Sequence, residues 1–144
     1  MQDEVEIFVE CPVARVFAYM DDVSREHEWQ PNIVEARQEP PGATRLGTRK
    51  SYVSEFMGRR VENTYVVQAF EPNERVVYQT TPESSLQAAV EISWEPVPSG
   101  TRVIMRVQGE ATGPLKLIPK RLLERGQKKG LESSLELLKN ILES

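Results

Sequence analysis

Residues 119–142 read PKRLLERGQKKGLESSLELLKNIL and form the longest helical pattern in the chain, so this stretch decides the fold. Pro119 suits the first turn of a helix, where its missing N–H is not needed. With about 100° of rotation per residue, the charged side chains fall on one side of this helix. The other side carries Leu123, Gln127, Leu131, Leu138 and Ile141. We predict one long amphipathic helix over 119–142 that packs its apolar face on the rest of the domain.

Three small residues interrupt that apolar face. Gly126, Gly130 and Ser134 follow one another at i, i+4 and i+8, where an ordinary core helix carries leucines. Each glycine weakens a helix by about 0.8–1 kcal/mol relative to alanine. Either a sheet backbone approaches the helix closely here, or the missing volume leaves room for a ligand. Gln127, between the glycines, either orients that ligand or reaches solvent.

The N-terminal segment supplies a strand and two short helices. Val5, Ile7 and Val9 alternate with glutamates, which is typical of a strand over 5–9. Pro12 then opens a helix whose apolar stripe is Val13, Val16, Phe17 and Met20. Asp21 and Asp22 end it, and Asp22 or Ser24 caps a second helical segment before the corner Trp29-Gln30-Pro31.

Six further strand patterns lie between this corner and the final helix. They cover residues 33–38, 48–56, 60–70, 75–81, 86–95 and 101–110. Met57-Gly58, Pro72-Asn73 and Pro98-Ser99-Gly100 are turn signals, and residues 114–118 form a separate turn before the helix. Strands followed by one long helix suggest a curved antiparallel sheet that grips the helix around a hollow.

Composition sets further bounds. The 144 residues fit a single domain over 1–144, and the net charge of −4 gives no field that would attract nucleic acid. The single cysteine, Cys11, forms no internal disulfide, and no N-terminal apolar stretch resembles a signal peptide. No apolar run approaches the roughly 20 residues that span a bilayer. We expect a cytoplasmic protein without stable membrane insertion.

Little in the chain indicates catalysis or metal binding. His27 is the single histidine, and with Cys11 it cannot supply the three or four ligands that zinc requires. Asp21 and Asp22 fit helix caps better than an acid/base pair. The sequence holds no glycine-rich phosphate loop and no G-x-S-x-G elbow. We predict no metal, no cofactor and no assembled catalytic set, and leave enzyme activity open while leaning against it.

The aromatic residues form a better constellation. Trp29, Tyr52, Phe56, Tyr65 and Tyr78 lie on different strands and corners but converge if the sheet curves around them. A ligand or water would then satisfy the tyrosine hydroxyls, whereas the alternative is ordinary core packing, which suits Trp94 best. A strand register error of one residue would exchange the inner and outer faces.

These motifs resemble a known superfamily over nearly the whole chain. The similarity rests on residues 6–19, on Asp21-Asp22 followed by Trp29-Gln30-Pro31, on residues 57–60 and 66–72, and on the closing helix. They resemble the START/Bet v 1-like (SRPBCC) superfamily, in particular its polyketide cyclase/dehydrase branch. That superfamily also includes lipid-transfer START domains and plant pathogenesis-related allergens.

The resemblance implies an α+β helix-grip fold. In it a curved antiparallel sheet of seven strands, two short helices and a long C-terminal helix enclose a cavity for lipids, sterols, quinones, hormones or polyketides. Carried onto this chain, the mouth of the cavity lies near residues 57–58, 84–86 and 112–118. The expected ligand-binding residues are Trp29, Tyr52, Phe56, Tyr65, Tyr78, Met105, Leu123, Gly126, Gln127 and Gly130.

Three functions follow as hypotheses. The first is binding or transport of a hydrophobic small molecule by a monomer or weak homodimer, which an interior packed solid would contradict. The second is a cyclase or dehydrase that polarises a polyketide-like chain with Tyr52, Tyr65, His27 or Gln127. The third is a protein-interaction module of the same fold, which a filled interior would favour.

Overall fold

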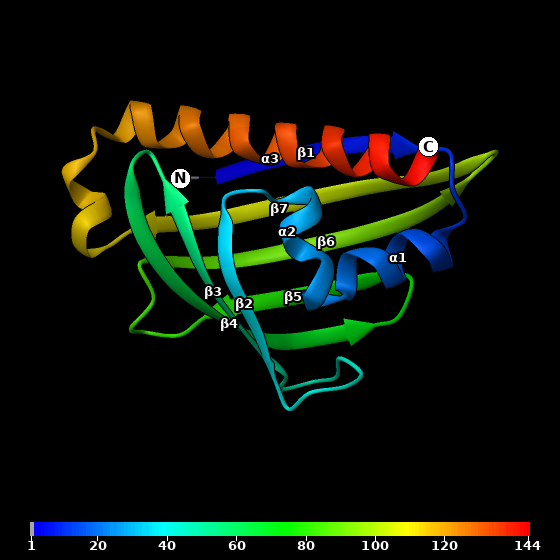
Figure 1. Ribbon diagram of the computed structural model, residues 1–144, viewed down its shortest axis with the longest axis horizontal. Coiled ribbons are helices and arrows are strands. Elements are labelled where there is room, and N and C mark those ends of the chain that lie inside the picture. The colour runs from blue at the N-terminus through cyan, green and yellow to red at the C-terminus, as the bar shows by residue number, and fades with distance from the viewer. Residues whose placement is uncertain (1) are drawn as a thin grey trace.

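Seven antiparallel strands wrap around the C-terminal helix in the computed structural model, which describes residues 2–144 (Figure 1). The strand order in the sheet is β1-β7-β6-β5-β4-β3-β2. The strands are β1 (Gln2–Val9), β2 (Ile33–Glu39), β3 (Arg49–Phe56), β4 (Arg59–Glu71), β5 (Arg75–Thr80), β6 (Leu86–Val97) and β7 (Gly100–Ala111). All neighbouring pairs are antiparallel, which confirms the predicted helix-grip architecture.

The helices occur where the sequence predicts them. They are α1 (Val13–Asp21), the 3₁₀ turn η1 (Val23–Arg25), α2 (Glu26–Trp29), the 3₁₀ turn η2 (Gly113–Leu117) and α3 (Lys120–Glu143). Asp22 caps η1, because its side chain accepts a hydrogen bond from the Ser24 N–H. None of the helices in the described part of the chain has the length and hydropathy needed to cross a bilayer.

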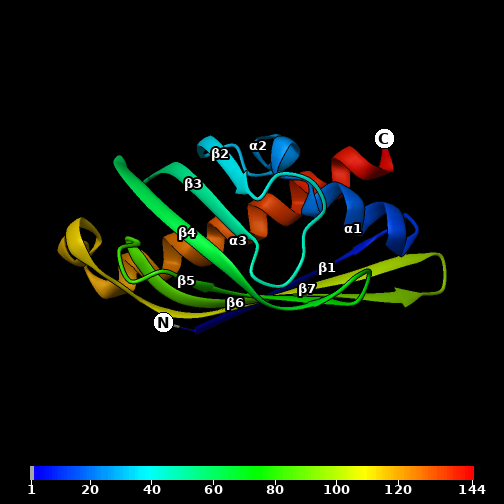
Figure 2. The same cartoon turned by 90° about the horizontal axis from the view of Figure 1, so that it is seen from below.

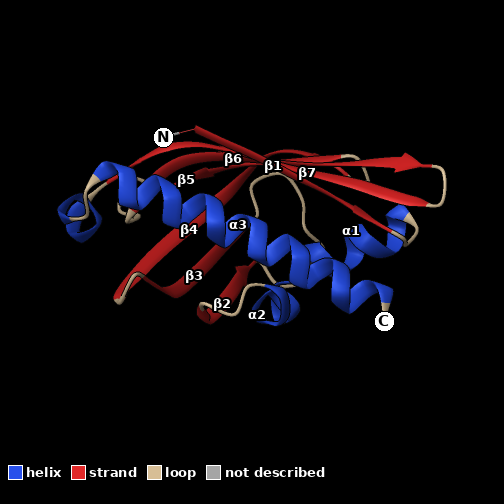
Figure 3. Ribbon diagram, turned by 90° about the horizontal axis from the view of Figure 1, so that it is seen from above, coloured by secondary structure: helices blue, strands red, loops and turns tan. Residues whose placement is uncertain are grey.

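Curvature of the sheet creates the grip. Figure 2 shows β3 and β4 rising out of the layer formed by β5, β6 and β7, so that β2 and α2 face that layer from the opposite side. In Figure 3, α3 lies lengthwise across the sheet. The β3–β4 hairpin turns at Met57 and Gly58, both at positive φ (51° and 77°), as a two-residue type I′ turn requires.

Two separate apolar clusters hold the fold. The larger one includes Val9, Val16 and Trp94 from the sheet and α1, together with Leu135 and Leu138 from the second half of α3. The smaller one contains Val61, Leu115, Ile118 and Leu123 near the start of α3. The helix therefore contacts solid core at both ends, and the space between the two clusters is left for the functional site.

Two details of the predicted helix face are corrected. Leu135 and Leu142 are buried, although the predicted apolar face omitted them, while Leu131 and Ile141 are only half-buried. Gly130, predicted to be buried, is exposed. The helix faces an open hollow at that turn rather than the sheet, so the glycine backbone remains accessible.

Candidate functional site

A cavity of about 640 Å³ lies between the two apolar clusters, under α3. Its walls come from the inner face of the sheet, from α2 and from α3 between Leu123 and Leu137. Met20, Val90, Ile92 and Val107 supply much of the apolar surface. The interior is therefore hollow, as the line of small residues on α3 suggested.

All ten residues predicted to bind ligand border this one cavity. The sheet and the α2 corner contribute Trp29, Tyr52, Phe56, Tyr65, Tyr78 and Met105, and α3 contributes Leu123, Gly126, Gln127 and Gly130. Met57, Leu86 and Leu115, from the three segments expected at the mouth, line it as well. Contact of these residues with a ligand stays a prediction.

The two glycines of α3 have different surroundings. A β-carbon at position 126 would lie 3.2 Å from the sulfur of Met57 and 3.3 Å from Cζ of Phe56, both at the ends of side chains on the β3–β4 hairpin. A β-carbon at position 130 would meet no heavy atom within 4 Å. The close approach of two side chains, and not of sheet backbone, therefore accounts for Gly126. Gly130, in contrast, borders empty space.

A buried carboxyl group borders the cavity between α2 and β3, the part that we call its inner end. Glu26 is buried on α2, and its Oε1 accepts a 2.7 Å hydrogen bond from the hydroxyl of Tyr52 on β3. Its Oε2 accepts a 2.5 Å bond from the side-chain amide of Gln30. Loss of hydration on burial raises the pKa of Glu26 from 4.5 to about 7, against smaller lowering effects of Tyr52, Lys50 and Gln30. The group changes its protonation state near neutral pH.

A buried ion pair lies beside this carboxyl. Lys50 on β3 is almost fully enclosed, and its Nζ donates to the backbone carbonyl of Asp21 at 2.8 Å and to Asp21 Oδ1 at 3.1 Å. The same ammonium lies 5.7 Å from the centre of the Tyr78 ring. Lys50 thus bonds to Asp21 at the end of α1 and not to Glu26, whose pKa it lowers through its charge alone.

Three tyrosines continue from Glu26 across the sheet. The rings of Tyr52 and Tyr65 are 5.8 Å apart, those of Tyr65 and Tyr78 are 6.2 Å apart, and both pairs are edge-to-face. Burial raises the pKa of Tyr65 to about 12 and also raises those of Tyr52 and Tyr78, with the negative charges of Glu26 and, at Tyr78, Asp21 adding to the effect. All three phenols stay protonated at neutral pH.

Glu26 and Lys50 were not predicted to be buried, although the sequence position of each indicates it. Glu26 is three residues before Trp29, so a helix that buries the indole also buries the carboxyl. Lys50 is two residues before Tyr52, which places it on the same inner face of β3. Neither residue is expected inside the fold from its type, because charged residues are seldom buried.

The remaining candidates lie elsewhere. His27 is exposed on α2, Cys11 is buried in the larger cluster, and the Trp94 ring packs edge-to-face on Phe17 at 4.8 Å. Across residues 2–144, no group of three or more potential metal ligands comes together. Neither His27 nor Cys11 has a place in the cavity.

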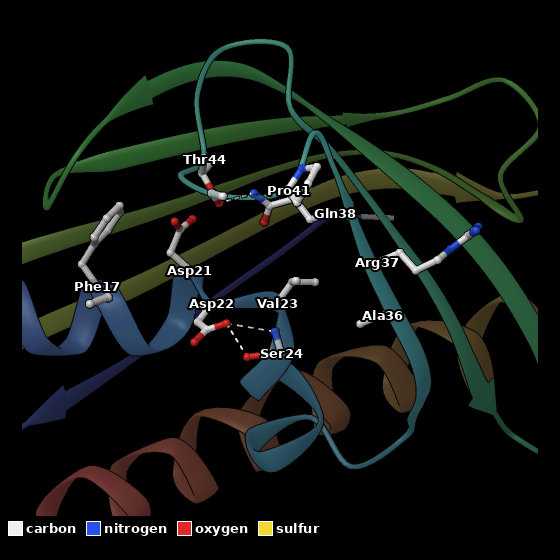
Figure 4. A pocket seen from close by; sticks show the side chains of 12 residues that line it. Phe17, Asp21, Asp22, Val23, Ser24, Ala36, Arg37, Gln38, Pro41 and Thr44 are labelled. Carbon is white, nitrogen blue, oxygen red and sulfur yellow. Dashed lines mark hydrogen bonds between the residues drawn. The ribbon is translucent and has the colours of Figure 1, made fainter.

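A second hollow, of about 670 Å³, lies between the end of α1, η1 and the β2–β3 connection (Figure 4). Some of its polar groups bond to one another: Asp22 accepts from Ser24, and Gln38 donates to the carbonyl of Gly42, whereas the buried hydroxyl of Thr44 has no partner among residues 2–144. Asp21, which borders the hollow, is bound to Lys50. None of the ten predicted residues lines this hollow, and we assign the site to the cavity under α3.

The chain is similar to a known family and to several solved structures. The family described as polyketide cyclase/dehydrase and lipid transport matches residues 3–143. A search of curated proteins finds no match. The structure of TTHA0849 from Thermus thermophilus is 19% identical, with a TM-score of 0.81 over 97% of this chain and 95% of that one.

Two further solved structures show the same fold. A START superfamily protein from Mycobacterium smegmatis is 14% identical, with a TM-score of 0.80 over 99% of this chain and 97% of that one. The di-domain ARO/CYC StfQ from the steffimycin biosynthetic pathway is 16% identical, with a TM-score of 0.78 over 99% of this chain and 50% of that one. The superfamily resemblance seen in the sequence is confirmed, and this chain belongs to the polyketide cyclase/dehydrase and lipid transport family.

Proposed function

We propose that this protein binds a hydrophobic small molecule in the cavity under α3. The observation that carries the proposal is the hollow itself, about 640 Å³ between two packed clusters. Small-molecule sites occupy about 300–1,000 Å³ and combine mostly apolar walls with a few polar groups. Here most of the wall is apolar, and Glu26 with the three tyrosines is one group of polar side chains within it.

Gly130 supports the same function. A glycine within a helix weakens it by about 0.8–1 kcal/mol relative to alanine, and no neighbouring atom forbids a side chain at this position. The helix is therefore less stable with glycine at this position than with alanine, and the glycine leaves the cavity and its opening clear. A ligand that enters past α3 gives a physical reason for that loss.

Substitutions at Gly130 separate binding from folding. Gly130→Leu adds a side chain beside the cavity, whereas Gly130→Ala gives nearly the same gain in helix stability with little added volume. Native mass spectrometry of gently purified protein, and thermal shifts with apolar probes, measure occupancy. We expect both variants to be at least as stable as the wild type, with binding weakened at least tenfold in Gly130→Leu alone. Equal binding by all three proteins, or failure of every apolar probe to bind the wild type, would contradict the proposal.

A second candidate function is cyclase or dehydrase chemistry, favoured by Glu26 and Trp29 at the wall of the cavity. A carboxyl with a pKa of about 7 can take up and release protons at neutral pH, and Glu26 is such a group at the wall of the cavity. The buried indole N–H of Trp29 has no acceptor among residues 2–144 and suits a carbonyl-rich chain. Turnover of a polyketide-like substrate that falls at least a hundredfold in Glu26→Gln would support this function; turnover unaffected by that change would remove Glu26 from it.

Other predictions remain open. The hypothesis of a protein-interaction module predicted a filled interior, and a hollow of about 640 Å³ gives that hypothesis no support. A monomer or weak homodimer, a cytoplasmic location and the absence of nucleic-acid partners stay predictions. Sedimentation of the purified protein tests the first of these directly.

A further inference from the structure

The buried end of the cavity has an unbalanced charge. Among residues 2–144, no salt bridge includes Glu26, although its carboxyl group is buried. The nearby cation, Lys50, bonds to Asp21 through both its carboxylate and its backbone carbonyl. An ionised carboxylate in a place with little water is costly unless an opposite charge pairs with it.

The elements around Glu26 supply no further cation at the buried end. From η1, Arg25 pairs with Asp22 and Glu28 at the surface. From α3, Gln127 and Lys129 border the cavity, but Lys129 is exposed to solvent. From β3, β4 and β5, the titratable groups beside Glu26 are Lys50 and the tyrosines 52, 65 and 78. Tyr52 and Gln30 donate hydrogen bonds to the carboxyl without bringing charge.

Aromatic side chains border the same end. Trp29, Tyr52, Tyr65 and Tyr78 all line the cavity, with the three tyrosines in edge-to-face contact. Aromatic rings attract cations through the negative charge of their faces, more strongly where water is excluded. Lys50 already lies beside one of these rings, 5.7 Å from the centre of Tyr78. The rings of Trp29, Tyr52 and Tyr65, beside a carboxylate with no ion-pair partner among the described residues, form the chemical environment that an organic ammonium ion prefers.

We propose that the inner end of the cavity is a subsite for an ammonium group, held by the carboxylate of Glu26 and surrounded by Trp29, Tyr52, Tyr65 and Tyr78. The ligand is then an amphiphilic amine whose apolar part extends along Val90, Ile92 and Val107 toward Leu123 and Gly130. This inference rests on the proposed function, because it names the class of ligand that the same cavity takes.

The pH dependence of binding has a definite sign. An alkylammonium ion keeps its proton across neutral pH, since its pKa resembles the value of about 10.4 for lysine. With a pKa of about 7, Glu26 is roughly one-tenth ionised at about pH 6 and nine-tenths ionised at about pH 8. Amine affinity should therefore rise about tenfold over this range.

Three probes of equal chain length test the inference: decylamine, decanol and decanoic acid, measured by isothermal titration calorimetry at about pH 6 and pH 8. Glu26→Gln keeps a polar side chain of the same size and removes the charge. Glu28→Gln is the matched control, because it removes a carboxylate two residues away that is exposed and bonded to Tyr19. We expect decylamine to bind the wild type about tenfold more tightly than decanol at pH 8.

That preference should shrink at pH 6, disappear in Glu26→Gln and persist in Glu28→Gln. Decanol that binds as tightly as decylamine at pH 8 would overturn the ammonium subsite while leaving the hydrophobic binder intact. Amine binding that Glu26→Gln does not weaken, or that strengthens toward pH 6, would overturn the subsite as well. If none of the three probes binds, the proposed function fails together with the inference.

Discussion

The hydroxyl of Tyr52 donates a 2.7 Å hydrogen bond to Oε1 of Glu26. This bond links the centre of β3 to the short helix α2, and it supports the ionised form of a carboxyl that burial otherwise keeps protonated. A sheet residue thereby adjusts the charge at the inner end of the cavity.

Replacing Tyr52 with phenylalanine should raise the pKa of Glu26 above its value of about 7, because the variant loses a hydrogen bond that lowers it. Carbon-13 NMR titration of the side-chain carboxyl measures the change. Tyr19→Phe is the control, since the Tyr19 hydroxyl bonds to Glu28 at the surface. A Glu26 pKa that stays constant or falls in Tyr52→Phe would show that the bond does not form in solution.

Glu26→Gln should change how stability depends on pH. The folded pKa of Glu26, about 7, lies above its usual 4.5, so its contribution to stability is complete below about pH 4.5 and is lost as pH rises through 7. The loss amounts to about 3 kcal/mol of unfolding free energy. In urea unfolding, the free energy of unfolding of Glu26→Gln relative to that of the wild type should be higher at pH 8 than at pH 5. Parallel pH profiles of the two proteins would rule this out.

Lys50→Met should destabilise the protein by about 3 kcal/mol, because Asp21 then keeps a largely enclosed charge without its partner. The pKa of Glu26 should also rise, since the positive charge of Lys50 lowers it. The matched control is Lys120→Met, which breaks an exposed 3.9 Å pair with Glu124 and should change stability by less than about 1 kcal/mol. Similar losses in both variants would indicate that Lys50 is hydrated.

Two glycine-to-alanine changes should have opposite signs. At Gly109 in β7, an added β-carbon would overlap the carbonyl oxygen of Gln87 on the paired strand, and we expect a loss of about 1–3 kcal/mol. At Gly130, the β-carbon enters open space, and the helix should gain about 0.8–1 kcal/mol. Thermal denaturation compares them. A loss at Gly130 would mean that α3 lies closer to its surroundings than 4 Å at that turn.

Periodic patterns in the sequence were sufficient to predict the architecture. The helix predicted for 119–142 is Lys120–Glu143, and the Met57-Gly58 turn joins β3 to β4. Alternation alone left the face of Tyr52, Tyr65 and Tyr78 open, because a register error of one residue exchanges the two faces of a strand. In the structure all three line the cavity.

Glu26 and Lys50 could not be predicted with equal ease. Charged residues are usually exposed, and only the surrounding packing reveals which of them are buried. The exposure of Gly130 depends on how far the sheet bends away from α3, a property of all seven strands together and not of any local pattern. Local rules therefore identified the walls of the site but not its charges or its opening.

Different residues of α3 line the hollow and anchor the helix in the core, and this separation has an evolutionary consequence. Leu135, Leu138 and Leu142 pack in the main core, whereas Leu123 packs in the small cluster and the residues of α3 that border the hollow lie between Leu123 and Leu137. Mutations of the lining residues can remodel the entrance while the anchoring leucines continue to maintain the fold. Descendants of such a chain can acquire a differently shaped hollow without first becoming unstable.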